Sequence, residues 1–399
     1  MKPRIAHGVQ SLPSSGIRRF FDLVATLDDV ISLGVGEPDF VTPWRIREAA
    51  IYSLEHGFTQ YTSNAGLPAL RTAIARMLAQ TYGVEYHPES EVLVTVGVSE
   101  ALDLALRAIL NPGDEVLIPE PCYVSYRPCT TLAGGIPVGV PTLAEESFRV
   151  RAERLAAAIT PRTRALMLNY PNNPTGASLR RANLQAIADL AEQHDLIVLS
   201  DEIYADLSYA APHICLASLP GMRDRTLLLN GFSKAYAMTG WRVGYACGPA
   251  DLIGAMTKIH QYTMLCASMP SQQAALEALR NGQGDRDEMV AQYSERRRLF
   301  VRYLNEIGLP CHEPDGAFYA FPSIGSTGLS SEAFAEQLLR EERVAVVPGN
   351  AFGAVGEGYV RCSYAASLAD LLEAVARMER FVRRHAASPA RTAVTATSQ

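Results

Sequence analysis

Two patterns of hydrophobic and polar residues, one typical of helices and one of strands, alternate along the chain between residues 44 and 283. Segments 44–56, 67–82 and 101–110 carry apolar residues at intervals of three and four, which predicts amphipathic helices, and 123–133 is a further candidate helix. Short apolar runs rich in Val, Ile and Leu separate such segments and are predicted to be strands, at 91–96, 115–119, 134–140, 164–169, 196–200 and 226–230.

This order of elements indicates an α/β fold. Strands that alternate with helices of ten to fifteen residues form a mainly parallel sheet, and nearly continuous apolar runs are typical of strands buried on both faces. We therefore expect a large domain over residues 44–283, with its sheet between layers of helices.

The pattern changes near residue 283. A long arginine-rich helix is predicted at 285–307, followed by a strand at 316–322, a helix at 331–342 and strands at 343–349 and 358–365. We expect these elements to form a smaller α+β domain, at 284–385, which the N-terminal segment 1–43 joins. The small and polar tail 386–399 is predicted to be disordered.

Composition narrows the class of protein. The 399 residues are 48% hydrophobic and 20% charged, with a formal net charge of −6, which argues against a nucleic-acid partner. No apolar run is long enough for a membrane span, and the N-terminus lacks the apolar core of a signal peptide. Seven dispersed cysteines without a CxxC pair, and histidines without HExxH spacing, argue against a metal site and indicate free thiols in the cytoplasm.

Lysine is rare in this chain and occurs only at Lys2, Lys234 and Lys258 among 36 basic residues. Lys234 lies within NGFSKAYAMTGWRVGY, a run of small, hydroxyl and aromatic residues. Unlike a guanidinium, an ε-amine can lose its proton at modest cost and form an imine with a carbonyl. The lysine alone is equally compatible with a surface position.

Two further segments have the composition of a ligand site at the end of a strand. In TVGVSEA (95–101) a strand is predicted to end at Gly97 and a helix to begin near Ser99, with Glu100 in its first turn, so that free amides and a hydroxyl could hold a phosphate. In YPNNPTG (170–176), Asn173 lies in a rigid loop where open sheets bind ligands. An ordinary helix cap and an ordinary turn are the alternatives.

Two charged residues stand in apolar surroundings. Asp201 follows a buried strand in SDEIY (200–204), where a carboxylate is costly unless a cation pairs with it. Arg361 interrupts the apolar alternation of GYVRCSYA (358–365) and could bind a carboxylate in two-pronged fashion. A surface loop and a structural salt bridge are the alternatives.

Together these residues match the needs of one cofactor, pyridoxal 5′-phosphate. It requires an amine for its aldehyde, an anion for its pyridine nitrogen, donors for its phenolic oxygen and a cradle for its phosphate. Over residues 13–384 the chain resembles the class I/II aminotransferases of the fold-type-I pyridoxal-phosphate family. The resemblance rests on ISLGVGEPDF, YTSNAGLPALR, YPNNPTG, SDEIY, SKAYAMTGWRVGYACGP, GAFY and VRCSYA, and is greatest to the branch with bacterial and archaeal aspartate and aromatic aminotransferases.

The resemblance implies a seven-stranded sheet and a role for each matching residue. Lys234 would form the imine with the cofactor and act as the base, and Asp201 would pair with the pyridine nitrogen. The phenolic oxygen would be held by Tyr204 and Asn173. The remaining implied contacts are Ser99, the backbone of Val98 and Arg242 to the phosphate, Ser233 to the cofactor and Tyr123 to its ring face. Arg361 would hold the substrate carboxylate, with Gly36 and Asn173 as further substrate contacts.

The resemblance also implies a homodimer with shared sites, since Tyr61 matches a position that reaches the phosphate from the neighbouring subunit. Two positions depart from many relatives. Tyr123 replaces a Trp found in some aspartate-specific relatives, and Gly231 stands where many relatives have a phosphate-binding Ser.

The expected reaction is ping-pong transfer of an amino group from an aromatic, bulky or aspartate donor to 2-oxoglutarate. The segment SLPSSGIRRFFDL is expected to close over the pocket, with Ile17 and Phe20 as apolar contacts and Arg18 or Arg19 as carboxylate contacts. The same residues could serve a carbon–sulfur β-lyase. An effector-sensing protein is disfavoured, because the N-terminal segment leaves no room for a DNA-binding domain.

Overall fold

The computed structural model describes residues 4–10, 12 and 27–386. The predicted lid contacts Ile17, Arg18, Arg19 and Phe20 lie outside the described residues, as does the tail from residue 387 onwards.

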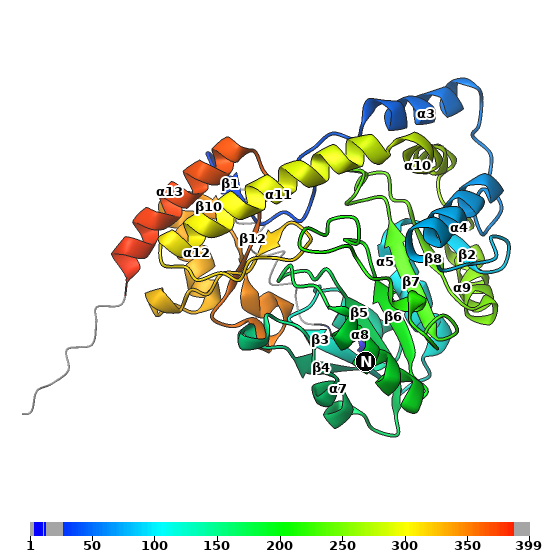
Figure 1. The fold of residues 1–399 in the computed structure, drawn as a ribbon, viewed down its shortest axis with the longest axis horizontal. Coiled ribbons are helices and arrows are strands. Elements are labelled where there is room, and N and C mark those ends of the chain that lie inside the picture. Colours follow the sequence, from blue (N-terminus) through cyan, green and yellow to red (C-terminus); the bar gives the residue numbers. More distant parts are fainter. Residues whose placement is uncertain (1–3, 11, 13–26, 387–399) are drawn as a thin grey trace, which may run out of the picture.

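A seven-stranded sheet occupies the centre of the molecule (Figure 1). The strand order is β2-β8-β7-β6-β5-β3-β4, and only β8 runs antiparallel to its two neighbours. All six strands predicted from apolar runs are present, and β8 completes the sheet. The bounds are β2 Val92–Thr95, β3 Glu115–Glu120, β4 Ile136–Pro141, β5 Thr163–Asn169, β6 Ile197–Asp201, β7 Thr226–Gly231 and β8 Gly244–Cys247.

Helices cover both faces of this sheet because successive strand residues point to opposite sides. On β5, Leu166 and Leu168 belong to a core with α7 and α8, whereas Met167 belongs to a second core with α5 and α9. The described helices of this region are α3 Trp44–Glu55, α4 Pro68–Tyr82, α5 Gly97–Ile109, α6 Tyr126–Leu132, α7 Ala152–Ala158, α8 Arg181–Gln193, α9 Ala250–Thr263 and α10 Met269–Asn281.

Two helices that border the edge of the sheet, α5 and α6, begin at other residues than predicted. Helix α5 begins at Gly97, two residues before the expected start at Ser99, because Gly97 adopts φ +76° and turns the chain directly from strand into helix. Helix α6 begins at Tyr126, so Tyr123 lies in the preceding loop instead of the helix. The first shift places Val98 and Ser99 in the first turn of α5, and the second places Tyr123 on a loop.

The C-terminal elements gather beside the sheet, at the left of Figure 1. An antiparallel sheet of order β11-β12-β9 forms there, and β1 pairs in parallel with β10. The predicted strand 343–349 is divided between two sheets, and 316–322 is extended only at β9. The bounds are β1 Ile31–Ser32, α11 Gln283–Glu306, β9 Tyr319–Ala320, α12 Ser331–Glu342, β10 Val344–Ala345, β11 Val347–Pro348, β12 Val360–Ser363 and α13 Leu368–His385.

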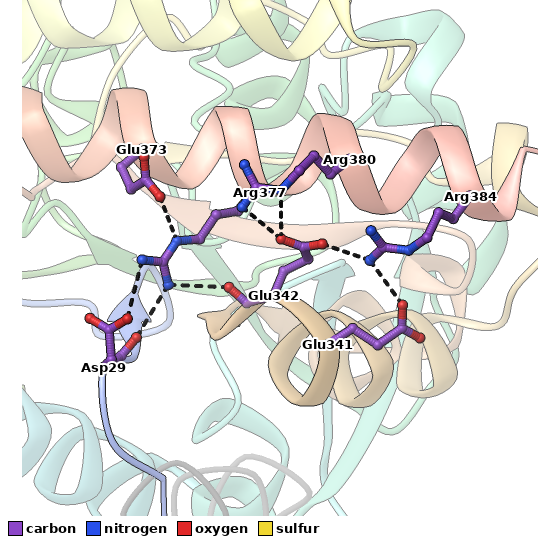
Figure 2. Close-up of polar contacts among 7 residues, drawn as sticks. All are labelled: Asp29, Glu341, Glu342, Glu373, Arg377, Arg380 and Arg384. Carbon is purple, nitrogen blue, oxygen red and sulfur yellow. Dashed lines mark hydrogen bonds and ion pairs between the residues drawn. The ribbon is translucent and has the colours of Figure 1, made fainter.

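Three arginines of α13 make polar contacts that join neighbouring elements, as Figure 2 shows. Glu342, at the end of α12, is buried and accepts hydrogen bonds from Arg380 and Arg384 of α13. Arg377 of the same helix reaches Asp29, next to β1. A carboxylate at such a buried position is tolerable only when cations pair with it. The network fixes the segment before β1 to α12 and α13.

Candidate active site

The largest set of predicted site residues surrounds one cavity of about 500 Å³. It lies where β5, β6 and β7 end and α5 begins, which is the edge at which parallel sheets bind ligands. Eleven predicted residues line it, namely Gly36, Val98, Ser99, Tyr123, Asn173, Asp201, Tyr204, Ser233, Lys234, Arg242 and Arg361.

Lys234 follows β7, and its Nζ donates a hydrogen bond to the Gly36 carbonyl oxygen at 2.6 Å. Burial, together with the nearby positive charges of Arg361 and Arg242, lowers the pKa of this amine to about 8, against the opposing effects of Glu37 and Asp201. An amine with this pKa is partly unprotonated near neutral pH. Lys234 is therefore suited to act as a nucleophile and as a base.

Asp201 ends β6 and is 6% exposed. Its carboxylate accepts hydrogen bonds from the Tyr126 hydroxyl at 2.6 Å and from the Ile203 amide at 3.2 Å. Burial raises the pKa of Asp201 to about 6, while the bond from Tyr126 opposes the rise. No cation forms an ion pair with this carboxylate among the described residues, so it is available to a positively charged group of a ligand.

Arg361, on β12, is 5% exposed and is held in a fixed orientation. Its guanidinium donates to the Asn173 side-chain oxygen at 2.9 Å and to the Gly34 carbonyl at 2.6 Å, and lies 4.5 Å from the centre of the Tyr319 ring. It has no carboxylate partner within the described part of the chain, and its Nε has no hydrogen-bond partner there. A structural salt bridge is thus excluded for these residues, and the cation is available for a carboxylate ligand.

The start of α5 forms an anion site. Arg242 donates to the Thr239 carbonyl at 2.8 Å, which places its guanidinium over Gly97. A Cβ at Gly97 would lie 2.7 Å from Arg242 Nη2, so glycine is required for this approach. Free amides of a helix N-terminus and an adjacent guanidinium favour a phosphate. Ser99 and Ser233 add hydroxyls to the lining of the cavity.

The departure at Gly231 has a steric explanation. A Cβ at this position would lie 2.9 Å from the Gly244 Cα and 3.2 Å from a methyl group of Val98. The backbones of β7 and β8 and the start of α5 approach too closely for a serine here. Ser233, which lines the cavity, is the hydroxyl nearest in sequence to Lys234.

Tyr61 is the one described site candidate that does not line the cavity, and it is 79% exposed. Other large apolar side chains are exposed in the same part of the sequence and near the end of α9. They are Val41, Trp44, Ile51, Tyr52, Leu54, Phe58, Tyr262, Met264 and Leu265.

Sequence reasoning missed several residues of the site. Asn169 ends β5 beside Asp201 in the sheet register, and its amide donates to the Asp201 carbonyl at 2.9 Å. Tyr126 holds Asp201, and its ring meets the edge of Tyr123, which forms part of the cavity wall. A polar residue at a strand end was a usable signal for Asn169. No local signal identified Tyr126, and Tyr319 belongs to the motif GAFY, to which no role was given.

The described residues favour neither a metal site nor a membrane span. They include no group of three or more His, Cys, Asp or Glu side chains placed to hold a metal ion. None of the described helices has the length and apolar character needed to cross a membrane.

Comparison with known proteins identifies the family. The family Aminotransferase class I and II matches residues 28–378. YugH of Bacillus subtilis (strain 168) is 57% identical over 376 residues, 94% of this chain and 97% of YugH. The aspartate aminotransferase of Pyrococcus abyssi is 49% identical over 372 residues, 92% of this chain and 96% of its own. The crystal structure of the aromatic aminotransferase from Pyrococcus horikoshii OT3 superposes with TM-score 0.88 at 48% identity, covering 92% of this chain and 99% of that one.

Proposed function

Because the chain belongs to the class I and II aminotransferases, which depend on pyridoxal phosphate, we propose that it transfers the amino group of an aromatic amino acid or aspartate to 2-oxoglutarate by a ping-pong mechanism. The observation that carries this proposal is that the Arg361 guanidinium, which has no carboxylate partner in the described part of the chain, lines the same cavity as the Lys234 amine. The guanidinium can hold the α-carboxylate of an amino acid while the amine acts at its α-carbon.

The cavity fits the cofactor, because it combines a nearly neutral amine, a buried carboxylate and an anion site on separate walls. Lys234 would hold the aldehyde, Asp201 the pyridine nitrogen, Tyr204 and Asn173 the phenolic oxygen, and Tyr123 the ring face. Ser99, Ser233, Arg242 and the amide of Val98 would hold the phosphate. Bound pyridoxal phosphate supplies an aldehyde that accepts the amino group and a ring that withdraws electrons from the α-carbon.

The protein residues then control binding and proton transfer. Arg361 fixes the carboxylate and so directs the α-proton of the substrate towards Lys234. The Lys234 amine would take this proton from the α-carbon and deliver it to the carbon of the cofactor's aldehyde group, which the lowered pKa of the amine favours. Asp201 keeps a proton on the ring nitrogen by remaining an anion beside it. Gly36, whose carbonyl oxygen accepts from Lys234, borders the substrate side of the cavity.

Substrate choice rests on the names of the relatives and on the cavity lining. Val35, Val124 and Phe352 add apolar surface to the cavity, and the Phe352 ring lies 4.9 Å from the Arg361 guanidinium, which suits an aromatic donor. A second carboxylate, as in aspartate or 2-oxoglutarate, would need another cation, and Arg18 or Arg19 of the undescribed segment is the proposed source.

A panel of amino donors with 2-oxoglutarate tests this proposal. We expect kcat/KM for phenylalanine, tyrosine or aspartate to exceed that for alanine by at least about tenfold, since a filled apolar or carboxylate subsite contributes about 1–3 kcal/mol. Glutamate formation, measured by coupled assay, is the readout. Ammonia and pyruvate from a cysteine conjugate without any oxoacid would instead indicate the β-lyase, which the relatives do not favour.

We further propose a homodimer in which Tyr61 of one subunit reaches the phosphate site of the other. Tyr61 and the apolar side chains around α3 are exposed, which supports the proposal that a second copy of the chain covers this surface. Mixing Tyr61→Ala with Lys234→Ala protein after reversible dissociation should yield hybrids with one intact site, and thus about a quarter of wild-type activity.

A matched mixture controls for this test. Asp201→Asn and Lys234→Ala both damage the site that a single chain provides, so their hybrids contain no intact site and should stay inactive. The shared-site proposal is wrong if the Tyr61 mixture recovers nothing beyond its parents, or if both mixtures recover equally.

We also propose the domain division 44–283 and 284–385, with 1–43 joining the second, and a cytoplasmic location. Pairing of β1 with β10 supports the place of the N-terminal segment. All seven cysteines are free thiols, which supports a reducing compartment.

A further inference from the structure

The hydroxyl groups of Tyr204 and Tyr319 form a buried pair in the cavity. Their oxygens are 2.8 Å apart, and their rings meet edge to face. The proposed function uses Tyr204 but gives Tyr319 no role. Tyr319 is nevertheless fully buried, lines the cavity and contacts two of the proposed functional groups, namely the Tyr204 hydroxyl and the Arg361 guanidinium.

We propose that Tyr319 is a positioning residue whose hydroxyl donates to Tyr204 and thereby strengthens the Tyr204 hydrogen bond to the cofactor's phenolic oxygen, while its ring supports Arg361. The inference rests on the proposed roles of Tyr204 and Arg361. The hydroxyl and the ring of Tyr319 thus have separate functions, and a different substitution removes each of them.

The direction of the hydroxyl pair follows from proton counting. A phenol has one proton, so a Tyr204 hydroxyl that donates to the cofactor can only accept from Tyr319. Burial raises the pKa of Tyr204 and of Tyr319, so both hydroxyls keep their protons near neutral pH. A hydroxyl that accepts a hydrogen bond becomes a stronger donor, by about 10–30% per bond.

The ring of Tyr319 lies beneath Arg361 because of the strand register. Tyr319 of β9 is paired with Ser363 of β12, so Arg361, two residues earlier, is its diagonal neighbour on the same face. The guanidinium carbon is 4.5 Å from the ring centre, a favourable cation–π arrangement. Gly36 permits this placement, since a Cβ there would collide with the Tyr319 hydroxyl.

The hydroxyl function is tested by Tyr319→Phe in the holoenzyme, which keeps the ring. The readout is the pH midpoint of the visible absorption change of the bound cofactor. A donor to the phenolic oxygen stabilises its anionic form, so weakening that donor raises the midpoint. We expect an upward shift of about one pH unit in Tyr204→Phe and about half a unit in Tyr319→Phe. Because Tyr319 acts through Tyr204, the double variant should match Tyr204→Phe alone.

The ring function is tested by steady-state kinetics. Tyr319→Phe should lower kcat about threefold and leave KM unchanged, because the ring still supports Arg361. Tyr319→Leu should raise KM for the amino donor about fivefold, the loss of one cation–π contact. Tyr364→Phe is the matched control: this buried tyrosine donates to the Ala317 carbonyl at 3.0 Å outside the cavity and should change neither quantity.

The outcomes distinguish a failure of the proposed role of Tyr319 from a failure of the proposed role of Tyr204, on which it rests. An unchanged midpoint in Tyr204→Phe would refute the role of Tyr204 itself. A shifted midpoint in Tyr204→Phe with none in Tyr319→Phe would refute only the positioning role of Tyr319. Additive shifts in the double variant, or a raised KM in Tyr319→Phe, would show that the Tyr319 hydroxyl contacts a ligand directly and would also overturn the proposal.

Discussion

Replacement of Lys234 by alanine is expected to lower kcat for transamination by at least about 10³-fold, since a positioned base contributes about 10²–10⁴ and the covalent anchor is lost as well. The physical reason is the environment of its amine, which burial and the neighbouring arginines hold near a pKa of about 8. Glutamate formation measures the rate, and the visible absorption of the cofactor measures the anchor.

The scarcity of lysine provides a matched control for this substitution. Lys258 is exposed on α9, away from the cavity, and Lys258→Ala should retain wild-type kcat and absorption. Undiminished turnover together with an unchanged absorption band in Lys234→Ala would refute the assignment of the base. A loss of equal size in Lys258→Ala would instead indicate a general effect on folding.

Asp201→Asn is expected to lower kcat by about 10²–10³-fold with little change in the fold. The amide has nearly the same shape and can still accept from Tyr126, which donates to Asp201 at 2.6 Å. It carries no charge, however, and cannot favour a proton on the ring nitrogen. The removal of one preorganised electrostatic contact of this kind typically costs about 2.7–4 kcal/mol of transition-state stabilisation. Single-turnover kinetics with saturating donor would isolate this step.

The same substitution five residues later serves as the control. Asp206 lies outside the cavity and pairs with Arg286 at 3.0 Å, so Asp206→Asn should affect stability more than kcat. A rate in Asp201→Asn within about threefold of wild type would remove the proposed electron-sink role, because so small a change is less than 1 kcal/mol.

Most of the large sheet could be predicted because its strands are buried on both faces. Apolar runs such as 164–169 and 196–200 have no plausible place outside a buried strand, and the structure confirms them as β5 and β6. The short strands β9, β10 and β11 could not be bounded in the same way. Each has only two residues, and pairing with distant partners, not local pattern, decides where it begins and ends.

The helix starts show the same limit at the level of single residues. The sequence placed a start near Ser99, whereas the positive φ of Gly97 begins α5 two residues earlier. The positive φ strains any other residue there, and Arg242, which is 145 residues away in sequence, lies against the glycine. A contact at such sequence separation leaves no mark in the local pattern.

The sequence by itself determined which chemical groups the site contains. An isolated lysine, an aspartate after a buried strand and an arginine in an apolar strand could be recognised because each is costly or unusual in its local context. The tertiary structure alone decided what those groups touch. It left Arg361 without a carboxylate partner among the described residues, held Asp201 through Tyr126, and joined Tyr204 to Tyr319. Those contacts join distant segments, so they arise only when the sheet brings the strand ends together.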